Sequence, residues 1–273
     1  MAQDRRDLAD FSAVQCSAPF PVTLRIAPGT SSVLLTASQD FAAELARVQT
    51  DVSNGTLTIS YTGQFSSAGA SAFGGSFAGG AVFASGGSSF SSSTSSSGGE
   101  SVSIINGVVY RNGQRVDGGD EGGAGGAMPD IRITVTAARF AALTLAGVGS
   151  IGNESVSALT EPELEVQLTG TGQLRLSNIQ ADTVRASLNG TGQMSLSGGA
   201  TTLSANLQGT GQLEALELPV QDAEVWVAGT GQAKVTVAQR LSGGIQGVGA
   251  IGYRGDPQLD VQKSFTGRLY KIP

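Results

Sequence analysis

A Gly-x-Gly turn recurs six times between residues 147 and 252 and limits what this half of the chain can fold into. The first glycines of successive turns are 23, 20, 19, 20 and 18 residues apart. The four central turns read GTGQ, whereas the outer two read GVGSIG and GVGAIG. A repeat of about 20 residues is typical of a solenoid, in which each coil buries its apolar face only by stacking on its neighbours.

Apolar and polar residues alternate on both sides of each turn. The residue two positions before the first glycine is aliphatic in every repeat, from Leu145 to Ile245, and alternate positions after the turn are mostly aliphatic again. A period of two predicts β-strands. At about 3.3 Å per residue, 20 residues trace a coil of two or three short strands. The sequence therefore predicts an all-β fold, a parallel β-helix (solenoid) with coils of about 20 residues.

The outer turns, at 147–152 and 247–252, also fit the G-x-G-x-x-G pattern of dinucleotide-binding loops. Such a loop must be followed by a helix whose N-terminus faces the phosphates, but the residues that follow are NESVSALTEP and YRGDPQ. We therefore expect no cofactor-binding residue. Instead, both glycines of each turn are predicted to face inward at a tight corner, and the two outer turns are predicted to mark the end coils.

Charge and missing residue types exclude several functions. The net charge is −6 and the cations are scattered, which disfavours nucleic acid as a partner. No run of 18 apolar residues occurs, so no membrane-spanning segment is expected. The chain has no histidine and one cysteine, Cys16, which excludes Ser-His-Asp and Cys-His catalysis, histidine-ligated metals and an internal disulfide. Cys16 is expected to be a core residue. Catalytic and metal-ligating residues are thus predicted to be none.

Composition divides the chain into three segments. Residues 1–61 are expected to form N-terminal strands of the solenoid domain, with a short helix near 40–49 that Asp40 caps. Residues 62–128 form a Gly/Ser/Phe-rich insert, in which two Asn-Gly pairs predict a small β-meander at 101–117. Residues 129–273 hold the repeat coils.

Several outward side chains are candidates for contact with a ligand or partner. Trp226 alternates with inward valines and is predicted to face outward, where it binds a sugar or a partner or is covered by the N-terminal segment. The turns place a threonine and a glutamine of each central coil outward, as a hydrogen-bonded amide ladder or as a polar strip for sugar hydroxyls. These residues are Thr171, Gln173, Thr191, Gln193, Thr210, Gln212, Thr230 and Gln232. In the insert, Phe73, Phe77, Phe83 and Phe90 could dock on a strand edge or a partner.

Carboxylates cluster at 161–165 (EPELE) and 213–217 (LEALE) and raise the alternative of a polysaccharide-degrading enzyme. The repeat register places Glu165 beside Arg185 and Glu214 beside Lys234. Solvated ion pairs between coils therefore explain these carboxylates, and we expect no enzymatic activity.

The N-terminal stretch DFSAVQCSAPFPVTLRIAPG, the strand NGTLTISY and the repeated turns together resemble the family described as "putative auto-transporter adhesin, head GIN domain". The resemblance covers roughly 10–61 and 130–271; the insert 62–128 is not part of it. It implies a right-handed parallel β-helix, an extracytoplasmic location and adhesion, without a catalytic motif. The start MAQDRRDLADF has no apolar leader segment, and we expect it to represent a mature N-terminus of a secreted, periplasmic or cell-surface protein.

The sequence therefore predicts a non-catalytic, extracytoplasmic, adhesin-like binding or structural module. Its expected partner is a second copy of itself, or a surface glycan or protein. The alternative function is a carbohydrate-binding or polysaccharide-degrading β-helix protein.

Overall fold

The computed structural model describes residues 1–29, 31–63, 130–154, 158–264 and 266–273, and the backbone of 102–105, 108–111 and 114–115. The chain divides into two compact units. One comprises Met1–Gly63 with Pro129–Pro273, and the other Gln64–Met128. The second unit holds a three-stranded antiparallel sheet of β7 (Val102–Ile105), β8 (Val108–Arg111) and β9 (Gln114–Arg115). Phe73, Phe77, Phe83 and Phe90 lie outside the described residues.

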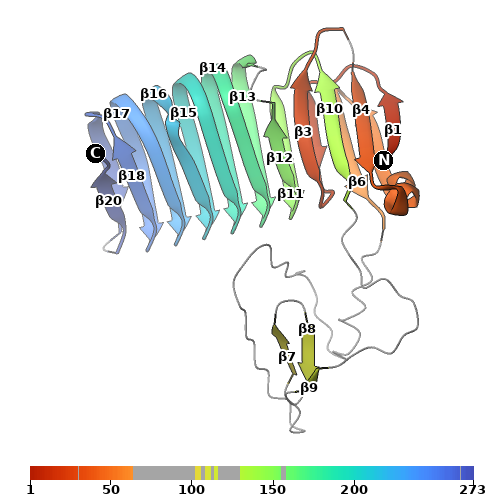
Figure 1. Ribbon diagram of the computed structural model, residues 1–273. Helices are drawn as coiled ribbons and strands as arrows, with labels where there is room; N and C mark the ends of the chain where they lie inside the picture. The colour runs from red at the N-terminus through yellow and green to blue at the C-terminus, as the bar shows by residue number, and fades with distance from the viewer. Residues whose placement is uncertain are drawn as a thin grey trace. The chain divides into compact units, whose positions relative to one another are not determined.

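The first unit is a parallel β-solenoid, which confirms the predicted fold class (Figure 1). Five long strands each end at the first glycine of a Gly-x-Gly turn, and all but the first also begin directly after the preceding turn: β13 (Leu159–Gly170), β14 (Gln173–Gly190), β15 (Gln193–Gly209), β16 (Gln212–Gly229) and β17 (Gln232–Gly247). Adjacent coils pair in parallel, with the turn glycines in register. The 20-residue period is therefore the circumference of one coil.

Columns of aliphatic side chains fill the interior. The residue two positions before each turn stacks directly on its counterpart in the next coil, and every member of this column is at most 2% exposed. The column consists of Leu168, Leu188, Leu207, Val227 and Ile245. Burying one such side chain contributes about 1.5–3 kcal/mol, so apolar stacking is the main source of stability.

The two glycines of each turn serve different purposes, which corrects the prediction that both face inward. Gly190 has a φ of +131°, and a Cβ there would lie 2.4 Å from the carbonyl oxygen of Gly170 in the preceding coil. The first glycine is thus needed for its backbone angle and for close stacking. The second glycine does face the interior, because a Cβ on Gly172 would lie 2.8 Å from Cδ2 of Leu145.

The turns GVGSIG and GVGAIG do not belong to the end coils, contrary to the prediction. On the N-terminal side, β2 (Ala13–Cys16) and β3 (Pro21–Ile26) stack in parallel on β11 (Ala142–Gly147) and β12 (Ser150–Asn153). On the C-terminal side, β19 (Gln258–Lys263) and β20 (Arg268–Lys271) stack on β17 and β18 (Ala250–Arg254). These outer coils lack a Gly-x-Gly turn, so the repeat pattern did not reveal them.

Antiparallel strands and one helix close the N-terminal end. They are β1 (Ala2–Asp7), β4 (Ser32–Ala37), η1 (Gln39–Arg47), β5 (Val48–Ser53), β6 (Thr56–Tyr61) and β10 (Arg132–Ala137). The helix is a 3₁₀ helix with Ser38 at its N-cap position, and no side chain caps it. The predicted cap, Asp40, lies in the first turn instead. Arg6 joins this end together by donating hydrogen bonds to the carbonyl oxygens of Val48 and Leu45.

Candidate binding surfaces

Trp226 lies on the sheet face formed by the residues directly before each Gly-x-Gly turn. This face, hereafter the Trp226 face, comprises the outward side chains of 165–169, 185–189, 204–208, 224–228 and 242–246. The indole is 39% exposed, and its Nε1 donates a hydrogen bond to Oε1 of Glu224 at 2.9 Å. Its ring covers Gly244 in the next coil, where a Cβ would lie 2.7 Å from Cζ3. The N-terminal strands stack on β11 and β12 (Figure 1), at the end of the solenoid away from β16, so they do not cover Trp226.

Exposed amides surround the indole on this face. Asn206 is the direct neighbour of Trp226 in the strand register, and Asn189, Gln208 and Gln246 lie on the same face. None of the four side chains makes a hydrogen bond within the described part of the chain. The sequence patterns did not mark them as a binding surface, although three of them occupy the position directly before the first glycine of a turn. The recurrence of amides directly before the turns could have identified this surface from the sequence alone.

The predicted threonine and glutamine columns run along the corner itself. The backbone N–H of each turn threonine donates to a glycine carbonyl of the preceding coil, as Thr191 does to Gly170 at 3.0 Å. The threonines, with Gln173 and Gln212, are exposed, whereas Gln193 and Gln232 are half-buried. All follow the strand register from coil to coil: Thr171, Thr191, Thr210 and Thr230, and Gln173, Gln193, Gln212 and Gln232.

The expected amide ladder does not form in these described coils. The side chain of Gln232 donates a hydrogen bond, but to the hydroxyl of Tyr270 at 2.6 Å rather than to another glutamine. No hydrogen bond joins the side chains of Gln173, Gln193 and Gln212 to one another in these described coils.

The clustered carboxylates are engaged in ion pairs. Lys234 Nζ lies 2.7 Å from Oε1 of Glu214, as predicted, and this hydrogen bond raises the pKa of Lys234. Arg185, however, pairs with Glu163 rather than with its register neighbour Glu165. Its guanidinium reaches the diagonal position, while Glu165 accepts a hydrogen bond from Gln167 at 2.6 Å.

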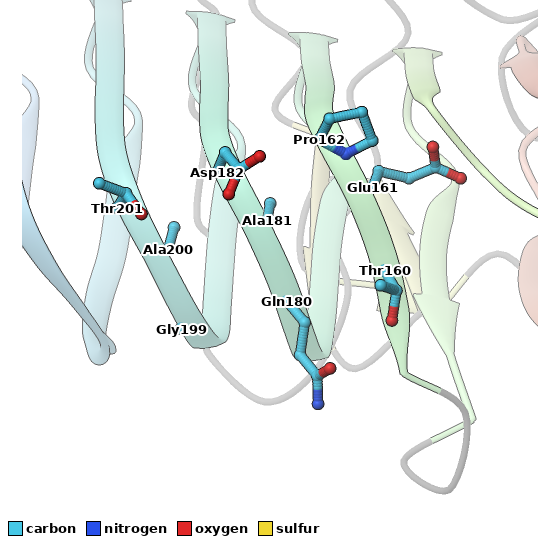
Figure 2. A pocket seen from close by; sticks show the side chains of 9 residues that line it. All are labelled: Thr160, Glu161, Pro162, Gln180, Ala181, Asp182, Gly199, Ala200 and Thr201. Atoms are coloured by element: carbon cyan, nitrogen blue, oxygen red, sulfur yellow. The ribbon is translucent and has the colours of Figure 1, made fainter.

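A shallow hollow of about 620 Å³ crosses β13, β14 and β15 on another face of the solenoid. Ala181 and Ala200 lie at its centre, and Glu161 and Asp182 contribute its carboxylates (Figure 2). The side chain of Glu161 points away from Asp182 (Figure 2). The two carboxylates therefore do not converge as a glycosidase pair would.

Neither a reactive thiol nor a cluster of metal-ligating side chains occurs among the described residues. Cys16 is fully buried, and burial raises the pKa of its thiol to about 11, so it is neutral at physiological pH. No cluster of three or more Cys, Asp or Glu side chains in the described ranges could hold a metal ion. Within the same ranges, no helix is long and apolar enough to cross a membrane.

Comparison with known protein families supplies the classification. The family model described as "Putative auto-transporter adhesin, head GIN domain" matches residues 112–257, more than half of the chain. The protein belongs to this head GIN domain family. The resemblance seen in the sequence is thereby confirmed, although the matched range starts at 112 and does not take in residues 10–61. No curated protein matches the chain at a significant level.

Solved structures share the fold of this head GIN domain protein over nearly its whole length. A "putative adhesin" from Bacteroides fragilis superposes with a TM-score of 0.67 at 17% identity, covering 99% of this chain and 97% of its own. A second "putative adhesin", from Parabacteroides merdae, has a TM-score of 0.60 at 14% identity, covering 100% and 96%. A "putative lipid binding protein" from Parabacteroides distasonis has a TM-score of 0.60 at 17% identity, covering 100% and 97%. At such low identities the likeness establishes the fold.

Proposed function

We propose that this head GIN domain protein is a non-catalytic, extracytoplasmic binding module of adhesin type, and that the Trp226 face binds a neutral glycan. The observation that carries the proposal is the seating of Trp226. Its ring lies over Gly244 and faces outward among amides that have no partner within the described chain. The extracytoplasmic location follows from membership of an adhesin-like family.

The chemistry of this face suits a sugar polymer. An aromatic ring with an exposed surface stacks on the apolar face of a pyranose, and neighbouring amides both donate to and accept from its hydroxyls. Asn189 and Gln208 lie in adjacent coils, about 4.8 Å apart along the stack, and Ala228 separates Gln208 from Gln246 in the same column. Because hydrogen-bonded strands hold the face rigid, binding costs little ordering entropy.

The ion pairs and hydrogen bonds of the clustered carboxylates support the non-catalytic part of the proposal. Glu163 and Glu214 are paired with cations, and Glu165 accepts a hydrogen bond. The chain has no histidine to act as an acid or base. We expect Glu163→Gln and Glu214→Gln to leave glycan binding unchanged. The enzyme alternative would be favoured if the unmodified protein cleaves a glycan and these substitutions abolish the cleavage.

Substitution of the indole tests the binding face. In a screen of neutral polysaccharides followed by calorimetry, we expect Trp226→Ala to weaken binding at least about fivefold, taking the about 1–3 kcal/mol that a base stacked on an aromatic side chain contributes as the guide. Leu259→Ala removes another exposed apolar side chain, 44% accessible, and serves as the matched control. Equal losses in both variants would contradict a site at Trp226.

Self-association is the second candidate, because β19 and β20 pair on one side only among the described residues. Unpaired strand edges can add strands from another chain. The inward columns of Ile245 and Tyr253, however, end in Lys263 and Lys271, and inward-pointing charges disfavour edge-to-edge stacking.

Light scattering distinguishes the two possibilities. We expect the mass of a single chain over a wide concentration range. A mass that grows with concentration, and that Lys263→Glu or Lys271→Glu changes, would instead favour assembly through this end.

A further inference from the structure

The last coils break the polar columns of the corner and leave a notch. In strand register, the column of Gln173, Gln193, Gln212 and Gln232 continues with Ala250 and then Arg268. The adjacent column runs from Lys234 through Gly252 to Tyr270. The motif GVGAIG thus replaces two long side chains by Ala250 and Gly252. We call the resulting feature the C-terminal notch, bounded by Gln232, Ala250, Lys263, Arg268 and Tyr270.

Two adjoining hollows of about 580 and 690 Å³ occupy this position. They share Gln232, Ala250, Gly267 and Arg268, so they lie side by side at the notch. Lys263, Leu269 and Tyr270 line the half nearer the open end, and Thr230, Val248 and Thr266 line the half at the corner. Each of the two hollows has a volume in the range of about 300–1,000 Å³ that is typical of small-molecule sites.

Tyr270 and Gln232 form a fixed wall of the notch. A Cβ on Gly252 would lie 2.8 Å from Cζ of Tyr270, which shows that the ring leans over the glycine. The hydroxyl of Tyr270 then accepts the hydrogen bond from Nε2 of Gln232 at 2.6 Å. The hydroxyl proton of Tyr270 and the amide oxygen of Gln232 both remain available to a ligand.

The notch also carries unpaired positive charge in a chain whose net charge is −6. Lys263 and Arg268 are exposed, and neither has an ion-pair partner among the residues that the structure describes. The other nearby cations are engaged. Lys234 pairs with Glu214, Lys271 pairs with Asp256, and Arg254 donates to the carbonyl oxygen of Pro273.

We propose that the C-terminal notch binds a carboxylate-bearing sugar unit. A guanidinium pairs with a carboxylate through two parallel hydrogen bonds, a role that falls to Arg268, with Lys263 as a second charge. Gln232, Tyr270 and Thr230 then face the ring hydroxyls, while Leu269 and Val248 contact its C–H groups. This inference extends the proposed glycan binding to an acidic sugar, but it concerns a different face, across the corner from Trp226, and either site can fail alone.

Calorimetry with oligogalacturonate and with a neutral maltooligosaccharide of equal length tests this site. We expect the carboxylated oligomer to bind at least tenfold more tightly, and Arg268→Gln to remove that preference. Ala250→Gln restores the repeat residue and fills the notch without changing charge, so it should abolish binding while the thermal unfolding temperature stays unchanged. Arg175→Gln, at another exposed and unpaired arginine on the same face, is the matched control and should have no effect.

Three results would overturn the proposal: equal affinity for both oligomers, equal loss in Arg175→Gln and Arg268→Gln, or retained binding in Ala250→Gln. Tighter binding to phosphatidylglycerol vesicles than to oligogalacturonate, lost in Arg268→Gln, would assign the notch to lipid phosphate instead. Trp226→Ala should leave oligogalacturonate binding intact, so a failure of the Trp226 face is distinguishable from a failure of the notch.

Discussion

At the scale of single residues, the inward or outward position of a side chain in the coil determines whether it packs in the core or can contact a ligand. Cys16 occupies an inward position of β2 and is fully buried, so the only thiol of the chain behaves as a small apolar residue. Trp226 occupies an outward position, and its orientation depends on the absence of a side chain at Gly244. Both inward and outward placement were predicted from alternation. The contact of the indole with Gly244 was not predicted, because it depends on which residue the next coil places beside the ring.

The buried thiol predicts a pH dependence of stability. Its pKa rises from 9.0 to about 11 on burial, so the unfolded chain ionises first as the pH increases. The stabilisation is therefore fully present below about pH 9 and is lost by about pH 11, and it amounts to roughly 2–3 kcal/mol. Urea unfolding at pH 8 and pH 10.5, compared with the same pair for Cys16→Ala, measures it. The expected result is a larger decrease in the wild-type protein; parallel decreases would show that the thiol is not protected.

At the scale of elements, the corner turn sets the geometry of the solenoid. The first glycine of every turn has a positive φ, and from Gly170 onward it also leaves no room for a Cβ beside the preceding coil. We expect Gly190→Ala to lower the free energy of unfolding by about 2–4 kcal/mol, since it combines backbone strain with a clash. Gly199 lies in the same solenoid without a positive φ, and a Cβ added there would have nothing within 4 Å. Gly199→Ala should change stability by less than about 1 kcal/mol, and similar losses in both would refute this role of the corner.

The strands and coils also show how much of the fold could be predicted from the sequence. The period and the alternation predicted the coils with GTGQ turns and their inner columns, because each of these coils stacks on a sequence neighbour of the same length. The coil of β2 and β3 was missed as a stacking partner of β11 and β12, since more than 100 residues separate them and its turn reads SAPF. The C-terminal notch was missed for a related reason. It arises where Ala250 interrupts a column, and the importance of that gap appears only once Arg268 and Tyr270 stack beyond it.

At the scale of the whole solenoid, the two ends differ. A helix and antiparallel strands close the N-terminal end, where Arg6 ties β1 to the backbone of β5 and η1. The C-terminal end closes with a short coil that continues two inward columns with the lysines Lys263 and Lys271 and two others with the leucines Leu259 and Leu269. Both binding surfaces that we propose, the Trp226 face and the notch, therefore lie on the hydrogen-bonded coils, which would hold them ready for a ligand without rearrangement.

The most direct measurement uses Trp226 itself, because it is the only tryptophan of the chain and its fluorescence reports on this face alone. Neutral oligosaccharides are titrated into the unmodified protein while the indole emission is followed. Binding on the Trp226 face predicts a saturable change in emission whose midpoint agrees with the calorimetric dissociation constant. A calorimetric binding signal with unchanged indole emission would place the glycan elsewhere and contradict a site at Trp226.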